Sequence, residues 1–350
     1  MKITRISIFF IMMICLILAP IFAGGKQESP APAASAPAVP ATSGAQLSGK
    51  VVVYMPSPAG LADKLAAGFE AKTGVKVEQF QGTTGEILAR LETEAANPQA
   101  DVVILASWSD GLGMKKTGKL LSYTPEGSDL MYSTWKDADN TVFGTSASAV
   151  GVIYNTRIFP TLSADWSELA GAQYKDQLAI PDPELSGSAK DFLAGFINNK
   201  GEAAGWKIWE SLAANGMEVA GANAAALEAV TTGEKGILVA GVDYNAYTSI
   251  NKGEPLNIYY PAGGTVINPR PAMILKTSPH VANAKAFMDY LLSDEAQKLV
   301  SAAYLLPGRS DIQFTNRTTV SQIPVLTTDW NWMMDNASAI AARLNTVCKK

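Results

Sequence analysis

The stretch that decides the fold is KVVVYMPSPAGLADKLAAGFEAKTGVKVEQFQGTTGEILARLETEAANPQADVVILAS, residues 50–107. Three apolar or alternating runs within it predict strands, at 50–55, 75–80 and 100–107. Two segments between these runs repeat apolar side chains at helical spacing and predict helices, at 60–74 and 83–98. Strands that alternate with helices form parallel sheets with right-handed crossovers, so the sequence predicts an α/β fold.

The same kinds of element continue toward the C-terminus. Further strands are predicted at 148–155, 236–242, 256–261 and 271–276. Further helices are predicted at 186–199, 202–216, 226–233 and 283–303. Because the chain is too long for one compact sheet of this kind, we expect two lobes. Ligands of open α/β sheets bind outside the carboxyl ends of the strands, so we expect the binding site in a cleft between the lobes.

Composition narrows the function classes. The 350 residues are 47% apolar and carry a net charge of −4, so nothing in the charge balance points to nucleic-acid binding. The chain has one histidine, His280, and two cysteines, Cys15 and Cys348. This inventory rules out Cys/His zinc clusters and disulfide scaffolds and leaves little room for a Ser/His/Asp or Cys/His enzyme. We therefore expect no enzyme and no catalytic residues, and we assign His280 no chemical role.

The N-terminus has the features of an export signal. Lys2 and Arg5 precede an apolar core, and small residues follow it, which predicts a cleaved signal peptide over residues 1–23 and a periplasmic protein. A retained membrane anchor and a lipid tether on Cys15 are the two alternatives. The Pro- and Ala-rich residues 24–49 predict an extended linker, because they hold too few large apolar groups to fold.

Seven motifs, in order, carry a family resemblance over residues 50–315. They are LAAGFEAKTGVKV, GTTGEILARLETEAANPQADVVI, AVGVIYNTRI, DWSELAGAQYKDQLAIPDPELSGSA, AVTTGEKGILVAGVDYNAY, AMILKTSPHVANAKAFMDYLLSDEAQKLV and LLPGRSDI. With them the chain resembles the ferric-iron-type extracellular solute-binding proteins of ABC importers, a family that includes organophosphate-binding relatives.

The resemblance implies the two-lobed type II periplasmic binding protein fold. Each lobe would be a mostly parallel sheet flanked by helices, with a hinge of two crossing strands and a ligand cleft between the lobes. The implied lobes are residues 50–147 plus 270–304 and residues 148–269 plus 305–350. The implied partners are an ABC permease and its ATPase, and we expect a monomer without a resident cofactor.

The resemblance also implies Fe(III) as cargo, held together with a synergistic anion. Iron-binding members use a histidine, a carboxylate and two adjacent tyrosines. Tyr244 matches one tyrosine, and Asp243 stands at the position of the other as a hard oxygen ligand, so both are predicted metal ligands if iron is the cargo. Ser57 stands where the family has its histidine, and Ser107 and Trp108 stand where it has its early carboxylate. All five are predicted ligand-binding residues.

The alternative cargo is a small organophosphate or another anion. Helix N-termini attract anions, and hydroxyl groups precede two predicted helices, at Thr83 and Thr84 and at Ser186, Gly187 and Ser188. Arg270 could add a bidentate contact to phosphate or carboxylate. The serines and threonines could equally be helix caps alone, and Arg270 could be an ion-pair residue of the hinge. An exported enzyme and a sensor accessory remain as further function classes.

Overall fold

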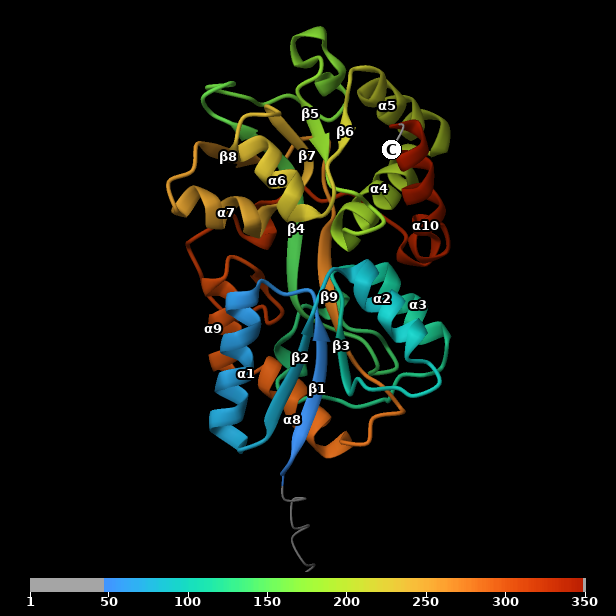
Figure 1. Ribbon diagram of the computed structural model, residues 1–350, viewed down its shortest axis with the longest axis vertical. Coiled ribbons are helices and arrows are strands. Elements are labelled where there is room, and N and C mark those ends of the chain that lie inside the picture. Colours follow the sequence, from blue (N-terminus) through green and yellow to red (C-terminus); the bar gives the residue numbers. More distant parts are fainter. Residues whose placement is uncertain (1–46, 349–350) are drawn as a thin grey trace, which may run out of the picture. The chain divides into compact units, whose positions relative to one another are not determined.

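The computed structural model describes residues 47–348. The predicted signal peptide, Cys15 and most of the predicted linker therefore lie outside the described residues. The described chain forms two α/β lobes (Figure 1). Among residues 47–348, no helix combines the length and the apolar character needed to cross a bilayer.

Lobe 1 is built on the strands of the stretch that opens the fold. Its parallel strands are β1 (Lys50–Met55), β2 (Lys76–Gln81) and β3 (Val102–Ile104), with β1 in the middle. Its helices are α1 (Ala59–Thr73), α2 (Thr84–Thr93), α3 (Trp108–Lys116), α8 (Val281–Leu291) and α9 (Asp294–Ala302). Buried Val, Leu and Phe side chains of β1 and α1 form its core, as the apolar runs predict.

Two long strands join the lobes. They are β4 (Phe143–Asn155) and β9 (Ile267–Ile274), which pair antiparallel and are buried along their whole length. The first half of β4 belongs to the sheet of lobe 1, where it also pairs with β10 (Leu306–Pro307). Its second half pairs with strands of lobe 2. This arrangement is the expected hinge of two crossing strands. Two of the predicted lobe boundaries, 147/148 and 269/270, fall within β4 and β9. The third, 304/305, puts β10 in lobe 2, whereas β10 pairs with the half of β4 that belongs to lobe 1.

Lobe 2 contains the remaining strands and helices. Its strands are β5 (Leu178–Ile180), β6 (Glu218–Val219), β7 (Ile237–Val242) and β8 (Leu256–Tyr259). Its helices are α4 (Gly187–Lys200), α5 (Glu202–Ala214), α6 (Asn223–Thr231), α7 (Asp243–Asn251) and α10 (Trp330–Val347). Strand β5 pairs parallel with β6 and β7, whereas β7 and β8 pair antiparallel with β4. Each lobe thus combines a parallel set of strands with antiparallel hinge strands, and the α/β class is confirmed.

Short 3-10 helices occupy several connections, at Ser128–Leu130, Ser133–Trp135, Glu168–Ala170, Ala172–Tyr174 and Val320–Gln322. The structure differs from the predicted elements at one long helix. The predicted helix 283–303 is two helices, because Ser293 interrupts it and caps α9 by accepting a hydrogen bond from the amide of Ala296 at 3.3 Å. Helices α3, α7 and α10 were not predicted.

Candidate functional site

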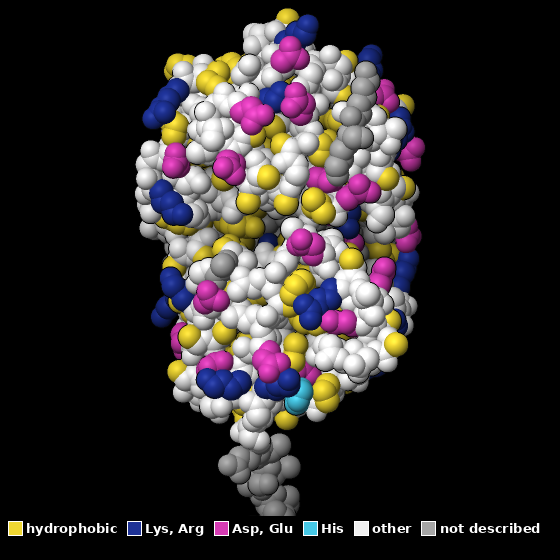
Figure 2. Space-filling view, viewed as in Figure 1, with side chains coloured by type: hydrophobic (Ala, Val, Ile, Leu, Met, Phe, Trp, Pro, Cys, Tyr) yellow, Lys and Arg dark blue, Asp and Glu magenta, His cyan; other side chains and the backbone are white. Residues whose placement is uncertain are grey.

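A cavity of about 380 Å³ lies where the two lobes meet. Residues that follow β1, β2 and β3 line it from lobe 1, and residues that follow β5, β6 and β7 line it from lobe 2. Figure 2 shows the surface hollowed at the level between the lobes. The cavity therefore lies at the carboxyl ends of the strands, as predicted, and its volume falls in the range of small-molecule sites.

The N-terminus of α2 forms one wall of this cavity. Thr83 is the N-cap: its hydroxyl accepts from the Glu86 amide at 3.2 Å, and the Glu86 carboxylate accepts from the Thr83 amide at 2.7 Å. The Thr84 hydroxyl accepts from the amide of Ala106 at 3.0 Å and so ties α2 to the end of β3. Both threonines line the cavity and also have structural roles.

The N-terminus of α4 faces this wall from lobe 2. Ser186 is its N-cap, accepting from the Ala189 amide at 3.2 Å, and its hydroxyl donates to Asn223 Oδ1 at 2.8 Å. Ser186 and Gly187 line the cavity. Ser188 is buried outside the lining, and its hydroxyl donates to the carbonyl of Ala106 at 3.3 Å. Ser186 is therefore both a cap and part of the cavity wall, whereas Ser188 joins the lobes.

Ser107 and Trp108, two further predicted ligand-binding residues, also lie outside the cavity lining. The Ser107 hydroxyl donates to Asp191 Oδ1 at 2.9 Å and is fully buried. The ring of Trp108 packs into the core of lobe 1 beside Ile87 and Leu105. Ser57, by contrast, lines the cavity.

Tyr244 and Asp243 are neighbours in the chain with different surroundings. Tyr244 lines the cavity, and burial raises the pKa of its phenol. The Asp243 carboxylate is fully buried away from the lining and forms an ion pair with Arg317. It also accepts from the hydroxyl of Tyr260 at 3.1 Å and from the amide of Ala149 at 3.0 Å. Its oxygens are therefore engaged inside lobe 2 and do not face the cavity as the predicted metal ligand would.

Arg270 lies directly behind the cavity wall on the hinge strand β9. Its side chain is 1% exposed. Nη2 donates to the carbonyl of Pro56 at 2.7 Å, and the Tyr244 ring lies 5.9 Å from the guanidinium carbon. Nε and Nη1 have no hydrogen-bond partner among residues 47–348. A buried cation with two unused donors is costly, so this arrangement calls for a functional explanation.

Several polar side chains at this site were not predicted from the sequence. Asn223 and Asn245 line the cavity from lobe 2. Asn268 is on the same face of β9 as Arg270, two residues before it, and its Oδ1 atom is buried without a partner in the described chain. The polar alternation in INPRPAMI was the signal that could have identified Asn268.

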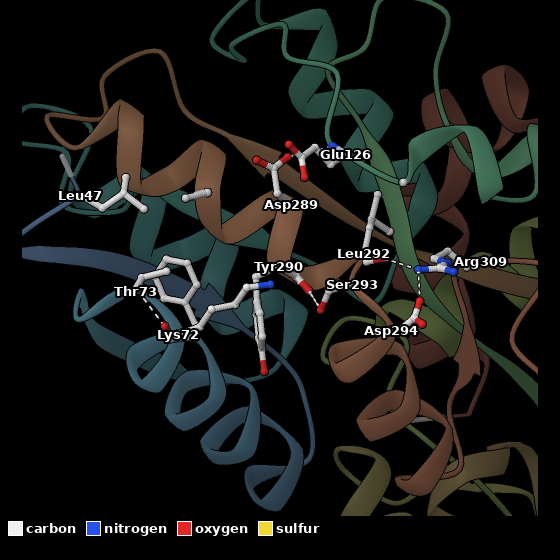
Figure 3. Close-up of a pocket in the computed structure, with 13 residues that line it drawn as sticks. Leu47, Lys72, Thr73, Glu126, Asp289, Tyr290, Leu292, Ser293, Asp294 and Arg309 are labelled. Atoms are coloured by element: carbon white, nitrogen blue, oxygen red, sulfur yellow. Dashed lines mark hydrogen bonds and ion pairs between the residues drawn. The ribbon is translucent and has the colours of Figure 1, made fainter. Parts of the chain in front are cut away.

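A second hollow, of about 440 Å³, lies on lobe 1 (Figure 3). Three of its charged groups, those of Arg309, Asp294 and Asp289, have partners within the protein. Arg309 forms ion pairs with Asp294 and Asp311 and donates to the carbonyl of Leu292 at 3.0 Å. Asp289 accepts from the hydroxyl of Tyr123 at 2.9 Å. This hollow is larger than the cavity between the lobes, but its one arginine is already paired with carboxylates of the protein.

Other predictions concern residues away from the cavity. Trp166, Trp206 and Trp209 are buried core residues. His280, to which we assigned no chemical role, has its Nδ1 3.0 Å from the buried carboxylate of Asp101. Within residues 47–348, no three His, Cys, Asp or Glu side chains are grouped so that they could hold a metal ion.

Comparison with known proteins gives one family and several similar chains. The family described as bacterial extracellular solute-binding protein matches residues 97–336. A periplasmic protein of Salmonella typhimurium, whose name assigns it provisionally to 2-aminoethylphosphonate binding, is 28% identical over 70% of this chain and 73% of its own length. Iron uptake protein A1 of Synechocystis is 24% identical over 68% of this chain and 70% of its own length.

A solved structure with the same fold is that of the periplasmic binding protein AfuA from Actinobacillus pleuropneumoniae with fructose 6-phosphate bound. It has a TM-score of 0.79 and 21% identity, and the match covers 86% of this chain and 99% of that one. The fold is therefore the type II periplasmic binding protein fold, as predicted.

Proposed function

This chain belongs to the bacterial extracellular solute-binding proteins, and on that basis we propose that its cargo is a small organic anion with a phosphate or phosphonate group. Family and fold are those of substrate-binding transport proteins and not of enzymes. The protein is the periplasmic solute-binding component of an ABC importer, and it would pass its cargo to a permease that a partner ATPase drives.

The observation that carries the proposal is the state of the Arg270 side chain. Two of its N–H donors, on Nε and Nη1, are buried without a partner behind the cavity wall. These two donors diverge, because each parallel pair of guanidinium N–H groups includes Nη2, which here donates to Pro56. Charge-assisted hydrogen bonds to phosphate oxygens are stronger than neutral ones. An anion that reaches these donors past the Pro56 and Tyr244 wall would accept from them and neutralise the buried charge.

The cavity wall supplies complementary groups for such a cargo. The N-terminal turns of α2 and α4 both reach the cavity, and each carries the positive end of a helix dipole. Ser57, Asn223 and Asn245 add neutral hydrogen-bonding groups suited to the hydroxyls or amine of an organic body. Two relatives support this class, one named for 2-aminoethylphosphonate binding and one solved with fructose 6-phosphate.

Fe(III) with a synergistic anion is the second candidate cargo. Tyr244 in the cavity and the similarity to iron uptake protein A1 favour it. Fe(III) prefers several anionic oxygens. Asp243, the predicted carboxylate ligand, is instead engaged by Arg317 and Tyr260, and burial of Tyr244 disfavours its phenolate. The donor set at the cavity thus suits an organic anion better than a ferric ion.

Ligand-induced changes in thermal stability distinguish the two cargoes. Fructose 6-phosphate, 2-aminoethylphosphonate, inorganic phosphate and ferric citrate would each be added to the purified protein. A ligand at about a hundred times its Kd stabilises a protein by about 2.7 kcal/mol, which gives a clear rise in Tm. We expect a phosphorus-bearing organic compound to raise Tm. A rise with ferric citrate alone, together with a visible absorption band that Tyr244→Phe removes, would assign iron instead.

A further inference from the structure

A buried carboxylate joins the two lobes beside the cavity. Asp191 lies in the second turn of α4, in lobe 2, and is fully buried. Its Oδ1 accepts from the hydroxyls of Ser107 and Ser109, and its Oδ2 accepts from the amide of Trp108 at 2.7 Å and from that of Ser109 at 3.4 Å. All four donors belong to the N-terminus of α3 in lobe 1. Asp191 therefore caps a helix of the opposite lobe.

A second charged contact lies next to the first. Lys190 of α4 donates to both carboxylate oxygens of Asp110 in α3, at 2.7 and 2.6 Å, and both side chains are largely buried. Ser188, two residues before Lys190, donates to the carbonyl of Ala106. Three residues of the first turns of α4 thus bind the other lobe, and we call the contacts of Ser188, Lys190 and Asp191 with lobe 1 the interlobe clasp.

The clasp is continuous with the cavity wall. Gly187 lines the cavity, and a Cβ at this position would lie 2.8 Å from the Cβ of Ser107 and 2.9 Å from Oγ1 of Thr84. The first turn of α4 and the start of α3 are therefore packed together without room for one more atom. A rotation about β4 and β9 that widened the cavity at this wall would separate α4 from α3. The clasp can form only while this wall is closed.

From these contacts we infer that Asp191 is a positioning residue for cargo binding: it holds the two lobes closed at the α3–α4 wall of the cavity. The inference rests on the proposed function, in that this cavity is the cargo site. Cargo affinity depends on the fraction of molecules in the binding-competent arrangement. Removal of the Asp191 carboxylate leaves two hydroxyls and two amides of α3 unpaired at the interface, and this loss favours the open arrangement.

The test combines a shape measurement with a binding measurement on the full-length protein without its signal peptide. The variants are Asp191→Ala, Asp191→Asn, and the control Lys116→Ala. Lys116 forms an ion pair with Asp335 of α10 at 2.7 Å, also between α3 and a helix of lobe 2, but both side chains are about 60% exposed. Solvent-exposed ion pairs of this kind contribute little to stability. Small-angle X-ray scattering gives the radius of gyration, and calorimetry gives the Kd for fructose 6-phosphate and 2-aminoethylphosphonate.

We expect Asp191→Ala to enlarge the radius of gyration of the free protein and to weaken binding of the responsive probe about tenfold or more, as expected if the closed fraction falls to a tenth. Added probe at saturation should restore the wild-type radius, which a merely structural defect would not allow. Asp191→Asn keeps the side-chain shape and one acceptor, so it should lie between Asp191→Ala and wild type. If Asp191→Ala fails to fold, the same two measurements on Asp191→Asn test the inference.

An unchanged radius and an affinity within threefold of wild type would overturn the inference, as would an equal effect of Lys116→Ala. The scattering result does not need a ligand. If neither probe binds the wild-type protein, the proposed function fails while the radius still decides whether Asp191 holds the lobes together. Hydrogen exchange at the amide of Trp108 gives the same answer locally, because release of Asp191 removes its acceptor.

Discussion

Replacement of Arg270 by methionine separates a binding role from a structural one. Methionine has a similar volume and no charge, so it fills the same space behind the cavity wall. The wild-type guanidinium makes one hydrogen bond within the protein, to the carbonyl of Pro56, and leaves Nε and Nη1 unpaired. Its removal relieves a desolvated charge and costs one bond. We therefore expect the free energy of unfolding of the free protein to change by no more than about 1 kcal/mol.

The same substitution should have a large effect on cargo binding. Two charge-assisted hydrogen bonds from Nε and Nη1 contribute about 1.5 to 3 kcal/mol each. Their loss, about 3 to 6 kcal/mol in total, corresponds to a Kd about a hundredfold to ten-thousandfold higher. Isothermal titration with the phosphorus-bearing probe measures the affinity, and urea denaturation of the free protein measures the stability.

Arg309→Met is the matched control. Arg309 forms ion pairs with Asp294 and Asp311 and donates to the carbonyl of Leu292, far from the cavity lining. Its replacement leaves a buried carbonyl unpaired, so we expect a loss of stability of about 1 to 3 kcal/mol and an unchanged Kd. If Arg270→Met behaves in the same way, with stability lowered and Kd within threefold of wild type, Arg270 is a structural anchor of the hinge and the anion proposal loses its basis.

Three further substitutions and a change of pH have definite expected outcomes. Ser186→Ala removes the N-cap of α4, so urea denaturation should show a loss of about 1 kcal/mol. Ser188→Ala should leave the Kd for the cargo within about threefold, because it removes a single hydrogen bond of the interlobe clasp, to the carbonyl of Ala106 at 3.3 Å. With ferric citrate, we expect both the wild-type protein and Tyr244→Phe to stay colourless, and we expect Tyr244→Phe to weaken probe binding by less than about tenfold. A visible absorption band that appears in the wild-type protein with ferric citrate and is absent in the variant contradicts this expectation. Burial, assisted by the nearby charge of Asp110, raises the pKa of Asp191 to about 6, above its unfolded value. Between about pH 4 and pH 6 the native state therefore binds one more proton at Asp191 than the unfolded state does. The contribution of Asp191 to the free energy of unfolding is thus greatest below about pH 4 and falls as the pH rises through about 6. The wild-type protein should accordingly gain stability relative to Asp191→Asn between pH 7 and pH 4, by up to about 3 kcal/mol in denaturation at each pH; a constant difference contradicts the buried, proton-binding carboxylate.

The strand and helix pattern of lobe 1 could be predicted because it is a local property of the sequence. The runs at 50–55 and 60–74 correspond to β1 and α1, since periodic apolar side chains record which face of an element is buried. Helix α3 was not predicted, because WSDGLGMKK has two glycines and little apolar periodicity. It is held in place by tertiary contacts, among them the cap that Asp191 provides from the other lobe.

The position of the cavity could be predicted from the sequence, but the hydrogen-bond partners of the polar residues around it could not. Thr83, Thr84, Ser186 and Gly187 begin helices and Tyr244 follows a strand, whereas Ser57 was predicted from the family resemblance; all six line the cavity. No local pattern reveals that the Asp243 carboxylate faces Arg317, a residue 74 positions away. The Asp191 carboxylate accepts a hydrogen bond from Ser107, which lies 84 positions earlier in the chain, and no local sequence pattern in α4 indicates this contact. Whether a polar group is free or engaged is decided by the tertiary structure, and the choice between the two cargoes depends on it.

The most direct test of the proposed cargo is mass spectrometry of the small molecule that the native protein retains, after purification from bacterial periplasm without unfolding and release by acid. The wild-type protein and Arg270→Met would be processed side by side, with iron measured in the same samples. We expect an organic phosphate or phosphonate to be released from the wild-type protein and to be strongly depleted in Arg270→Met. Bound iron without a phosphorus-bearing organic compound, in equal amount in both proteins, would contradict an anion site built on Arg270.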